Sequence, residues 1–167
     1  MKLADVTAIL RALNDAQARY LIVGGLAVVA HGYVRATVDL DIVLQLEREN
    51  VLRAMKALEG IGYRPLVPVD SAEFADEQMR KTWREEKQMV VFQMRNPDPT
   101  STRLDIFVEE PFPFADELAR AKWEELAGIQ APVVRLERLL QMKRESGRPQ
   151  DLADIEQLRL IMENRKV

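Results

Sequence analysis

Residues 20–44 read YLIVGGLAVVAHGYVRATVDLDIVL, and the step that decides the fold is Asp39-Leu40-Asp41. Aspartate is a poor strand residue, yet the residues around this step are apolar or β-branched. Side chains alternate along a strand, so Asp39 and Asp41 share one face while Leu40 and Ile42 share the other. The stretch predicts a strand over residues 38–45 with one packed face and one acidic face.

Two glycines stand upstream of the acidic strand. Residues 20–25 predict a buried strand that ends in Gly24 and Gly25, and residues 26–32 predict a short helix closed by a glycine. Glycines between a strand and a helix let a phosphate approach backbone N–H groups without a Cβ in its way. The alternative for this pair is a tight turn without a ligand.

A later stretch repeats the acidic pattern. Residues 102–110 read TRLDIFVEE, which places Leu104 and Ile106 on one face and Asp105 on the other. If this strand neighbours the first, three carboxylates converge, and they raise one another's pKa unless a cation neutralises them. Mg²⁺ is the cation that accepts carboxylates together with substrate phosphates, with Mn²⁺ as the alternative. Such a site suits nucleotidyl transfer, whereas the plain alternative is a solvated strand face.

Composition narrows the classes of protein. There is no cysteine and only one histidine, which excludes disulfides and thiolate metal sites, so any metal is held by oxygen. No apolar run approaches the roughly 20 residues that cross a bilayer, and the first 20 residues lack the solid apolar centre of a secretory signal. We therefore expect a cytoplasmic protein with no membrane partner. The net charge of −3 neither supports nor excludes an RNA partner.

The order of elements predicts an α/β (α+β) domain with a small mixed sheet flanked by helices. Expected helices cover residues 4–17, 26–32, 48–63, 115–121, 133–147 and 148–163, and further strands cover 89–94 and 102–110. The length fits one domain over residues 1–167. Within it we expect a sheet-containing core to about residue 110 and a mainly helical C-terminal part over about 111–167.

These motifs resemble the signature of the polymerase-β-type nucleotidyltransferase superfamily: a Gly-Gly at a helix start, an Asp-X-Asp strand, and a third acid on a later strand. The segment RATVDLD at 35–41 and the closing LERLLQMKRESGRPQDLADIEQL at 136–158 are also similar to small bacterial nucleotidyltransferases related to the AbiEii toxin family. The resemblance covers roughly residues 20–45 and 101–161.

The resemblance implies a role for each matching residue. Asp39, Asp41 and Asp105 would bind Mg²⁺, and Asp105 would help to deprotonate the attacking hydroxyl. Gly24 and Gly25 would hold the triphosphate of an NTP. Arg35 and Thr37, just before the acidic strand, would contact phosphates.

Lys143 is expected on the inward side of its helix. It lies seven residues after Leu136 and three after Leu140, so it continues their buried stripe toward the acidic, phosphate-binding site. This makes it a further nucleotide-binding candidate, and the alternative is a lysine whose amine reaches water. The roles of Arg148, Asp151 and Asp154 divide between substrate contact and helix-start structure.

The function implied by these features is Mg²⁺-dependent transfer of an NMP from an NTP to a hydroxyl of RNA, protein or a small molecule, with tRNA or a protein as candidate acceptors. A role in a toxin–antitoxin pair, with a cognate antitoxin or a homodimer, is a related expectation. The alternative is a non-catalytic nucleotide-binding or partner-binding protein. A cationic, aminoglycoside-like acceptor would require an acidic pocket, for instance near Glu109 and Glu110, whereas tRNA would require a basic groove.

Overall fold

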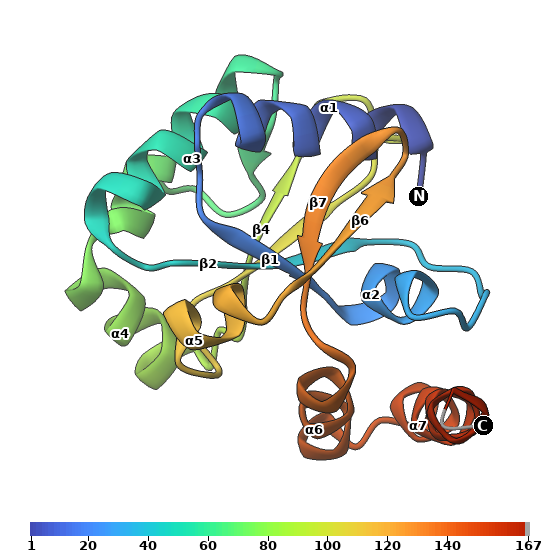
Figure 1. Cartoon of the computed structure of the whole chain (residues 1–167). Coiled ribbons are helices and arrows are strands. Elements are labelled where there is room, and N and C mark those ends of the chain that lie inside the picture. Colours follow the sequence, from blue (N-terminus) through green and yellow to red (C-terminus); the bar gives the residue numbers. More distant parts are fainter. Residues whose placement is uncertain (166–167) are drawn as a thin grey trace.

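The computed structural model describes residues 1–165, which form one mixed β-sheet with helices on both of its faces (Figure 1). The helices are α1 (Leu3–Asp15), α2 (Gly24–Ala30), α3 (Arg48–Gly60), the 3₁₀ helix η1 (Ser71–Ala75), α4 (Glu77–Lys87), α5 (Phe114–Ala119), α6 (Leu136–Ser146) and α7 (Pro149–Asn164). The strands are β1 (Tyr20–Val23), β2 (Leu40–Leu44), β3 (Arg64–Pro65), β4 (Val91–Arg95), β5 (Leu104–Phe107), β6 (Lys122–Leu126) and β7 (Ile129–Val133).

The sheet runs in the order β3-β4-β5-β2-β1-β7-β6. The pairs β2–β5 and β1–β7 are parallel, and the other neighbours are antiparallel. The two acid-bearing strands are therefore adjacent, as the sequence predicts. The mixed α/β fold is confirmed.

One face of the sheet is packed against α1 and α3 (Figure 1). The alternate residues Leu40, Ile42 and Leu44 of β2 are fully buried there, beside Leu104 and Ile106 of β5. The opposite face is covered by α2 over β1 and β2, with α6 and α7 beyond it (Figure 1). The acidic residues of β2 and β5 lie on this second face, next to α2.

The apolar residues that recur every three or four positions along the expected helices are buried, as the 3.6-residue helical period requires. On α1 the buried residues are Val6, Ile9, Leu10 and Leu13, and on α6 they are Leu136, Leu139, Leu140 and Lys143. Gly147 ends α6 in the left-handed region at φ 61°, and Pro149 begins α7. A glycine end followed by a proline start is the expected punctuation between two helices.

The sequence-based division at about residue 110 misplaced the end of the sheet. Strands β6 and β7 form a hairpin that adds two strands beyond β1, so the region after residue 110 is not only helical. The expected helix at 133–147 begins three residues later, because Val133 still belongs to β7. The hairpin was missed because Lys122, Glu124 and Pro132 are all poor strand residues.

None of the helices in residues 1–165 is both long enough and apolar enough to cross a membrane.

Candidate active site

Three carboxylates meet where β2 and β5 run side by side. Asp41 and Asp105 are direct partners in the parallel register, and Asp39 lies immediately before β2. Asp105 is 7% exposed, while Asp39 and Asp41 are half-buried. The predicted convergence of these three residues from two strands is confirmed.

Arg103 lies between two of the carboxylates. Its Nη2 atom forms an ion pair with Asp39, and its Nε atom donates to Asp105 Oδ1 at 3.0 Å. Arg103 has no role predicted from the sequence, although alternation places position 103 on the same face as Asp105. The guanidinium supplies positive charge to the acidic face in this structure.

The electrostatics of the cluster show that one arginine does not neutralise it. Burial, together with the negative charges of Asp105 and Asp39, raises the pKa of Asp41 to about 7, although a hydrogen bond from the backbone N–H of Gly25 opposes the shift. Burial also raises the pKa of Asp105, although Arg103 opposes the shift. Asp41 is thus poised between its charged and neutral forms near neutral pH.

The glycine turn packs directly against the carboxylates. Gly24 has φ +64°, and a Cβ added there would lie 2.7 Å from Asp41 Cγ, far inside van der Waals contact. A Cβ on Gly25 would lie 2.9 Å from Thr37 Cβ. Both positions therefore require glycine, and the backbone at the start of α2 borders the acidic site without side chains in between.

Gly24→Ala is expected to destabilise the protein by about 2–4 kcal/mol, because it adds backbone strain at positive φ to a clash with Asp41. Gly128→Ala is the matched control, since Gly128 also has positive φ, at +79°, but has nothing within 4 Å of an added Cβ. The control should be destabilised only by the backbone strain, that is by about 1 kcal/mol. Urea unfolding of both variants measures the difference, and equal losses would show that Gly24 does not pack against Asp41 as described.

The donor set suits a hard divalent cation, because it consists of carboxylate oxygens that lack enough positive charge. As the side chains stand, however, no group of three or more His, Cys, Asp or Glu within residues 1–165 is arranged to hold a metal ion. Arg103 already interacts with Asp39 and Asp105, two of the three candidate ligands. The chemistry of the site therefore fits Mg²⁺, while its present geometry is that of an arginine-bridged cluster.

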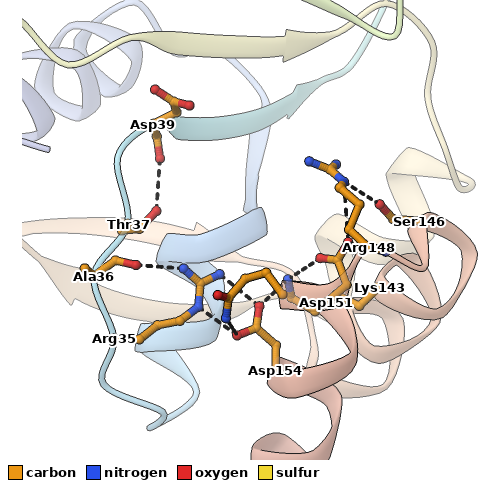
Figure 2. A network of polar contacts seen from close by, with 10 residues as sticks. Arg35, Ala36, Thr37, Asp39, Lys143, Ser146, Arg148, Asp151 and Asp154 are labelled. Carbon is orange, nitrogen blue, oxygen red and sulfur yellow. Dashed lines mark hydrogen bonds and ion pairs between the residues drawn. The ribbon is translucent and has the colours of Figure 1, made fainter.

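A second polar cluster joins α6 and α7 to the segment before β2 (Figure 2). Lys143 Nζ lies 2.7 Å from Asp154 Oδ2 and 3.0 Å from Asp151 Oδ1. Arg35 reaches Asp154 with two nitrogens, at 2.7 and 2.9 Å. Burial alone would raise the pKa of Asp154, but hydrogen bonds from Arg35, Lys143 and Gln150 hold it below its usual value.

These contacts revise what the sequence suggested for three candidates. Lys143 is buried as predicted, but its carboxylate partners are Asp151 and Asp154 rather than the acids of β2. The Arg35 guanidinium is committed to Asp154, and Thr37 Oγ1 donates to the backbone carbonyl of Asp39 at 3.4 Å. Arg35 and Thr37 lie next to Gly25 at the start of α2, and Lys143 is linked to Arg35 through Asp154.

No family profile matches the sequence, and no curated protein does either. Solved structures do resemble it. A lincosamide antibiotic adenylyltransferase, LnuA, bound to lincomycin, superposes with a TM-score of 0.62 at 19% identity, over 95% of this chain and 96% of that one. The fold is that of a nucleotidyltransferase.

The antibiotic-resistance factor ANT(2'')-Ia shows the same likeness in two structures. Its solution structure gives a TM-score of 0.58 at 20% identity, over 97% of this chain and 83% of that one. Its complex with adenylyl-2"-tobramycin gives 0.56 at 14% identity, over 99% and 98%. These likenesses confirm the polymerase-β-type fold, and the narrower resemblance to AbiEii proteins stays a prediction.

Proposed function

We propose that this protein transfers an NMP from an NTP to a hydroxyl acceptor and releases pyrophosphate. The observation that carries the proposal is the pairing of Asp41 with Asp105 across parallel strands, with Asp39 alongside and a side-chain-free glycine turn against Asp41. A buried acidic cluster in which Asp41 has a raised pKa, packed against a glycine turn, has no evident structural purpose. The shared fold with known adenylyltransferases supports the same conclusion.

Each site residue has a proposed part. Asp39, Asp41 and Asp105 would hold Mg²⁺, which when bound would neutralise the carboxylates and the triphosphate charge. Gly24 and Gly25 present backbone that a phosphate can approach closely. The Asp105 carboxylate receives the proton of the acceptor hydroxyl, because it lies on the opposite side of β2 from the glycine turn.

The cluster of Arg35, Lys143, Asp151 and Asp154 belongs to the nucleotide side of the proposal. It anchors the segment that leads into Asp39 to the start of α7 (Figure 2). Arg35 and Lys143 bring two cations close to that segment, where Thr37 lies beside Gly25. We assign all three residues to triphosphate binding, with Asp151 and Asp154 fixing the cations.

Two physiological roles are compatible with nucleotidyl transfer. LnuA and ANT(2'')-Ia are named for antibiotic substrates, whereas the resemblance to AbiEii-related proteins points to a toxin–antitoxin component with a cognate antitoxin. Affinity purification of the tagged protein from its host would identify a candidate antitoxin if a second protein copurifies in a stoichiometric complex.

Mg²⁺ together with ATP is expected to raise the unfolding temperature by several degrees. A ligand at 100 times its Kd adds about 2.7 kcal/mol to the free energy of unfolding, and a protein of this size gains about 2–4 °C per kcal/mol. Thermal unfolding with and without EDTA measures the shift. The absence of any shift at millimolar Mg²⁺ and each of the four NTPs would contradict a nucleotide site.

Transfer chemistry is tested with ATP labelled on either the α- or the γ-phosphate. Incubation with cell RNA, protein and small-molecule fractions should label a product from the α-labelled nucleotide only, because nucleotidyl transfer releases the γ-phosphate in pyrophosphate. Asp105→Asn should remove the labelling, and Asp15→Asn, at an exposed position on α1, should not. Label from γ-labelled ATP would instead indicate a kinase.

Arg103 favours a second candidate, a non-catalytic protein that retains the fold to bind a nucleotide or a partner. Its ion pairs with Asp39 and Asp105 already supply a cation to two of the carboxylates. A protein of this kind would bind an NTP but release no pyrophosphate with any acceptor fraction. Calorimetry combined with a pyrophosphate assay separates the two functions.

A further inference from the structure

The sheet face that carries the carboxylates continues past Asp105 onto β4. Along β4, Val91, Gln93 and Arg95 are half-buried, while the two residues between them are fully buried in the core. Gln93 is the register partner of Asp105, so alternation places Val91 and Arg95 on the same face as that carboxylate. A partly open surface therefore lies directly beside the acidic site.

The strand register brings three arginines side by side at this end of the sheet. Arg64 of β3 is the register partner of Arg95. The β4–β5 register, extended by two residues beyond the Gln93–Asp105 pair, places Arg95 opposite Arg103. We call Arg64, Arg95 and Arg103 the arginine row. Like charges directly opposite one another destabilise a sheet, so folding alone does not explain the row.

The row is only partly neutralised. Arg103 is paired with Asp39 and Asp105, and Arg64 Nη1 donates to the backbone carbonyls of Glu59 and Tyr63. Among residues 1–165, no carboxylate lies within ion-pair distance of Arg64 or Arg95. The Nε atom of Arg95 is buried and has no hydrogen-bond partner. A buried N–H without an acceptor carries an energetic penalty, and the same guanidinium has four further N–H donors that suit an anionic ligand.

The position of the row relative to the reaction rests on the proposed function. In phosphoryl and nucleotidyl transfer the attacking and leaving oxygens lie roughly in line. With the triphosphate at Gly24 and Gly25, on the α2 side of β2, pyrophosphate leaves toward that side. The acceptor hydroxyl must then arrive from the opposite side, across β5 and β4. That direction crosses the arginine row.

The surface does not suit a polycationic acceptor. Such a molecule would need the two acids just after β5, Glu109 and Glu110. Both already have partners within the protein: Glu109 pairs with Arg84 at 3.6 Å, and Glu110 accepts a hydrogen bond from the Leu46 N–H. Arginines instead match phosphate oxygens, to which they can donate two parallel hydrogen bonds.

We propose that the acceptor carries phosphate close to its reactive hydroxyl, and that the arginine row, with Arg95 at its centre, binds this phosphate. The 3′ end of an oligonucleotide and a sugar phosphate share this chemistry. The proposal gives the arginine row a function and distinguishes this protein from enzymes that modify cationic antibiotics.

The test measures the binding of a short fluorescein-labelled single-stranded ribo-oligonucleotide with a free 3′-hydroxyl, by anisotropy over a range of salt concentrations. Arg95→Gln is expected to weaken binding about five- to tenfold and to reduce the slope of log K against log salt by about one, as for the loss of one phosphate contact. Arg95→Lys should retain the salt slope because it keeps the charge. Arg11→Gln, an exposed arginine on α1 over the opposite face of the sheet, is the matched control and should bind as the parent does.

Competition identifies the source of the phosphate. Displacement of the probe by ribose 5-phosphate at concentrations similar to its own would indicate a small sugar-phosphate acceptor, and resistance to it would indicate an oligonucleotide. Either result supports the proposal. Failure of the parent to bind both the probe and ribose 5-phosphate, or an unchanged affinity in Arg95→Gln, overturns it.

A separate measurement keeps this proposal distinct from the proposed function. Calorimetry with Mg²⁺ and ATP should give the same Kd for the parent and for Arg95→Gln, because Arg95 lies on the acceptor side. Nucleotide binding by the parent without oligonucleotide or sugar-phosphate binding would refute the phosphate-bearing acceptor alone. Failure of the parent to bind any NTP would refute the nucleotide site itself.

Discussion

Asp41→Asn is expected to reduce nucleotidyl transfer by more than about 100-fold while making the metal-free protein more stable at neutral pH. The loss of activity should exceed the 10–100-fold effect of residues that only orient a ligand, because Asp41 is itself a proposed ligand. The gain in stability follows from the raised pKa of the carboxylate, about 7 in the folded protein against 3.8 when exposed.

The direction of the pH effect follows from proton binding. Between pH 4 and 7 the folded protein keeps a proton on Asp41 that the unfolded chain releases, so the free energy of unfolding falls as pH rises through this range. Each pKa unit corresponds to about 1.4 kcal/mol, so a shift from 3.8 to about 7 gives a total loss on the order of 4 kcal/mol by pH 8. Asparagine does not titrate, so the variant should lack this loss.

Chemical unfolding of both proteins at pH 5 and pH 8, in EDTA, measures the effect. The stability of the variant relative to the parent should increase from pH 5 to pH 8. Asp15→Asn serves as the control, because Asp15 is exposed on α1 and the change in formal charge is the same. A lower stability of Asp41→Asn than of the parent at pH 8 would contradict the prediction. It would mean that the charged Asp41 carboxylate stabilises the folded protein despite its burial beside Asp39 and Asp105.

Asp154→Ala is expected to lower the free energy of unfolding by about 3–5 kcal/mol and the unfolding temperature by about 10 °C. The Asp154 side chain is fully buried and accepts hydrogen bonds from Arg35 and Gln150 as well as the ion pair from Lys143. Its removal leaves the buried ammonium of Lys143 with Asp151 alone and deprives Arg35 of its bidentate partner.

Two further variants serve as controls for Asp154→Ala. Glu156→Ala changes an exposed acid on the same helix and should alter stability by no more than about 0.5 kcal/mol. The double change Lys143→Met with Asp154→Leu removes a buried cation and a buried anion together, and should recover part of the loss, since buried ion pairs can be replaced by apolar residues. Equal stability of Asp154→Ala and Glu156→Ala in thermal and urea unfolding would show that the cluster does not hold α6, α7 and the Arg35 segment together.

Much of the site could be predicted because the relevant patterns are local. Alternation along residues 38–45 and 102–110 assigns Asp41 and Asp105 to the face opposite the core, and this requires no knowledge of the partners. The glycine pair is a conformational signal of the same kind, confirmed by the positive φ of Gly24 and by the close approach of Asp41.

The errors concern contacts between segments far apart in the sequence. The β6–β7 hairpin pairs through Lys122, Glu124 and Pro132, whose intrinsic preferences oppose a strand, so only pairing with β1 makes it part of the sheet. Arg103 could have been assigned to the acidic face, but its ion pair with Asp39 depends on the register of β5 against β2.

The sequence by itself determined the two-faced strands, the glycine turn and the buried position of Lys143, since each depends on a periodicity or a backbone preference within a few residues. Only the tertiary structure decided how the charges are paired: Lys143 with Asp154, Arg35 with the same carboxylate, and Arg103 with Asp39. The physical reason is that a buried charge requires an opposite charge within a few ångströms. The sequence offers several oppositely charged residues for each such charge and does not say which of them will be close. Folding selects among them by bringing particular strands and helices together.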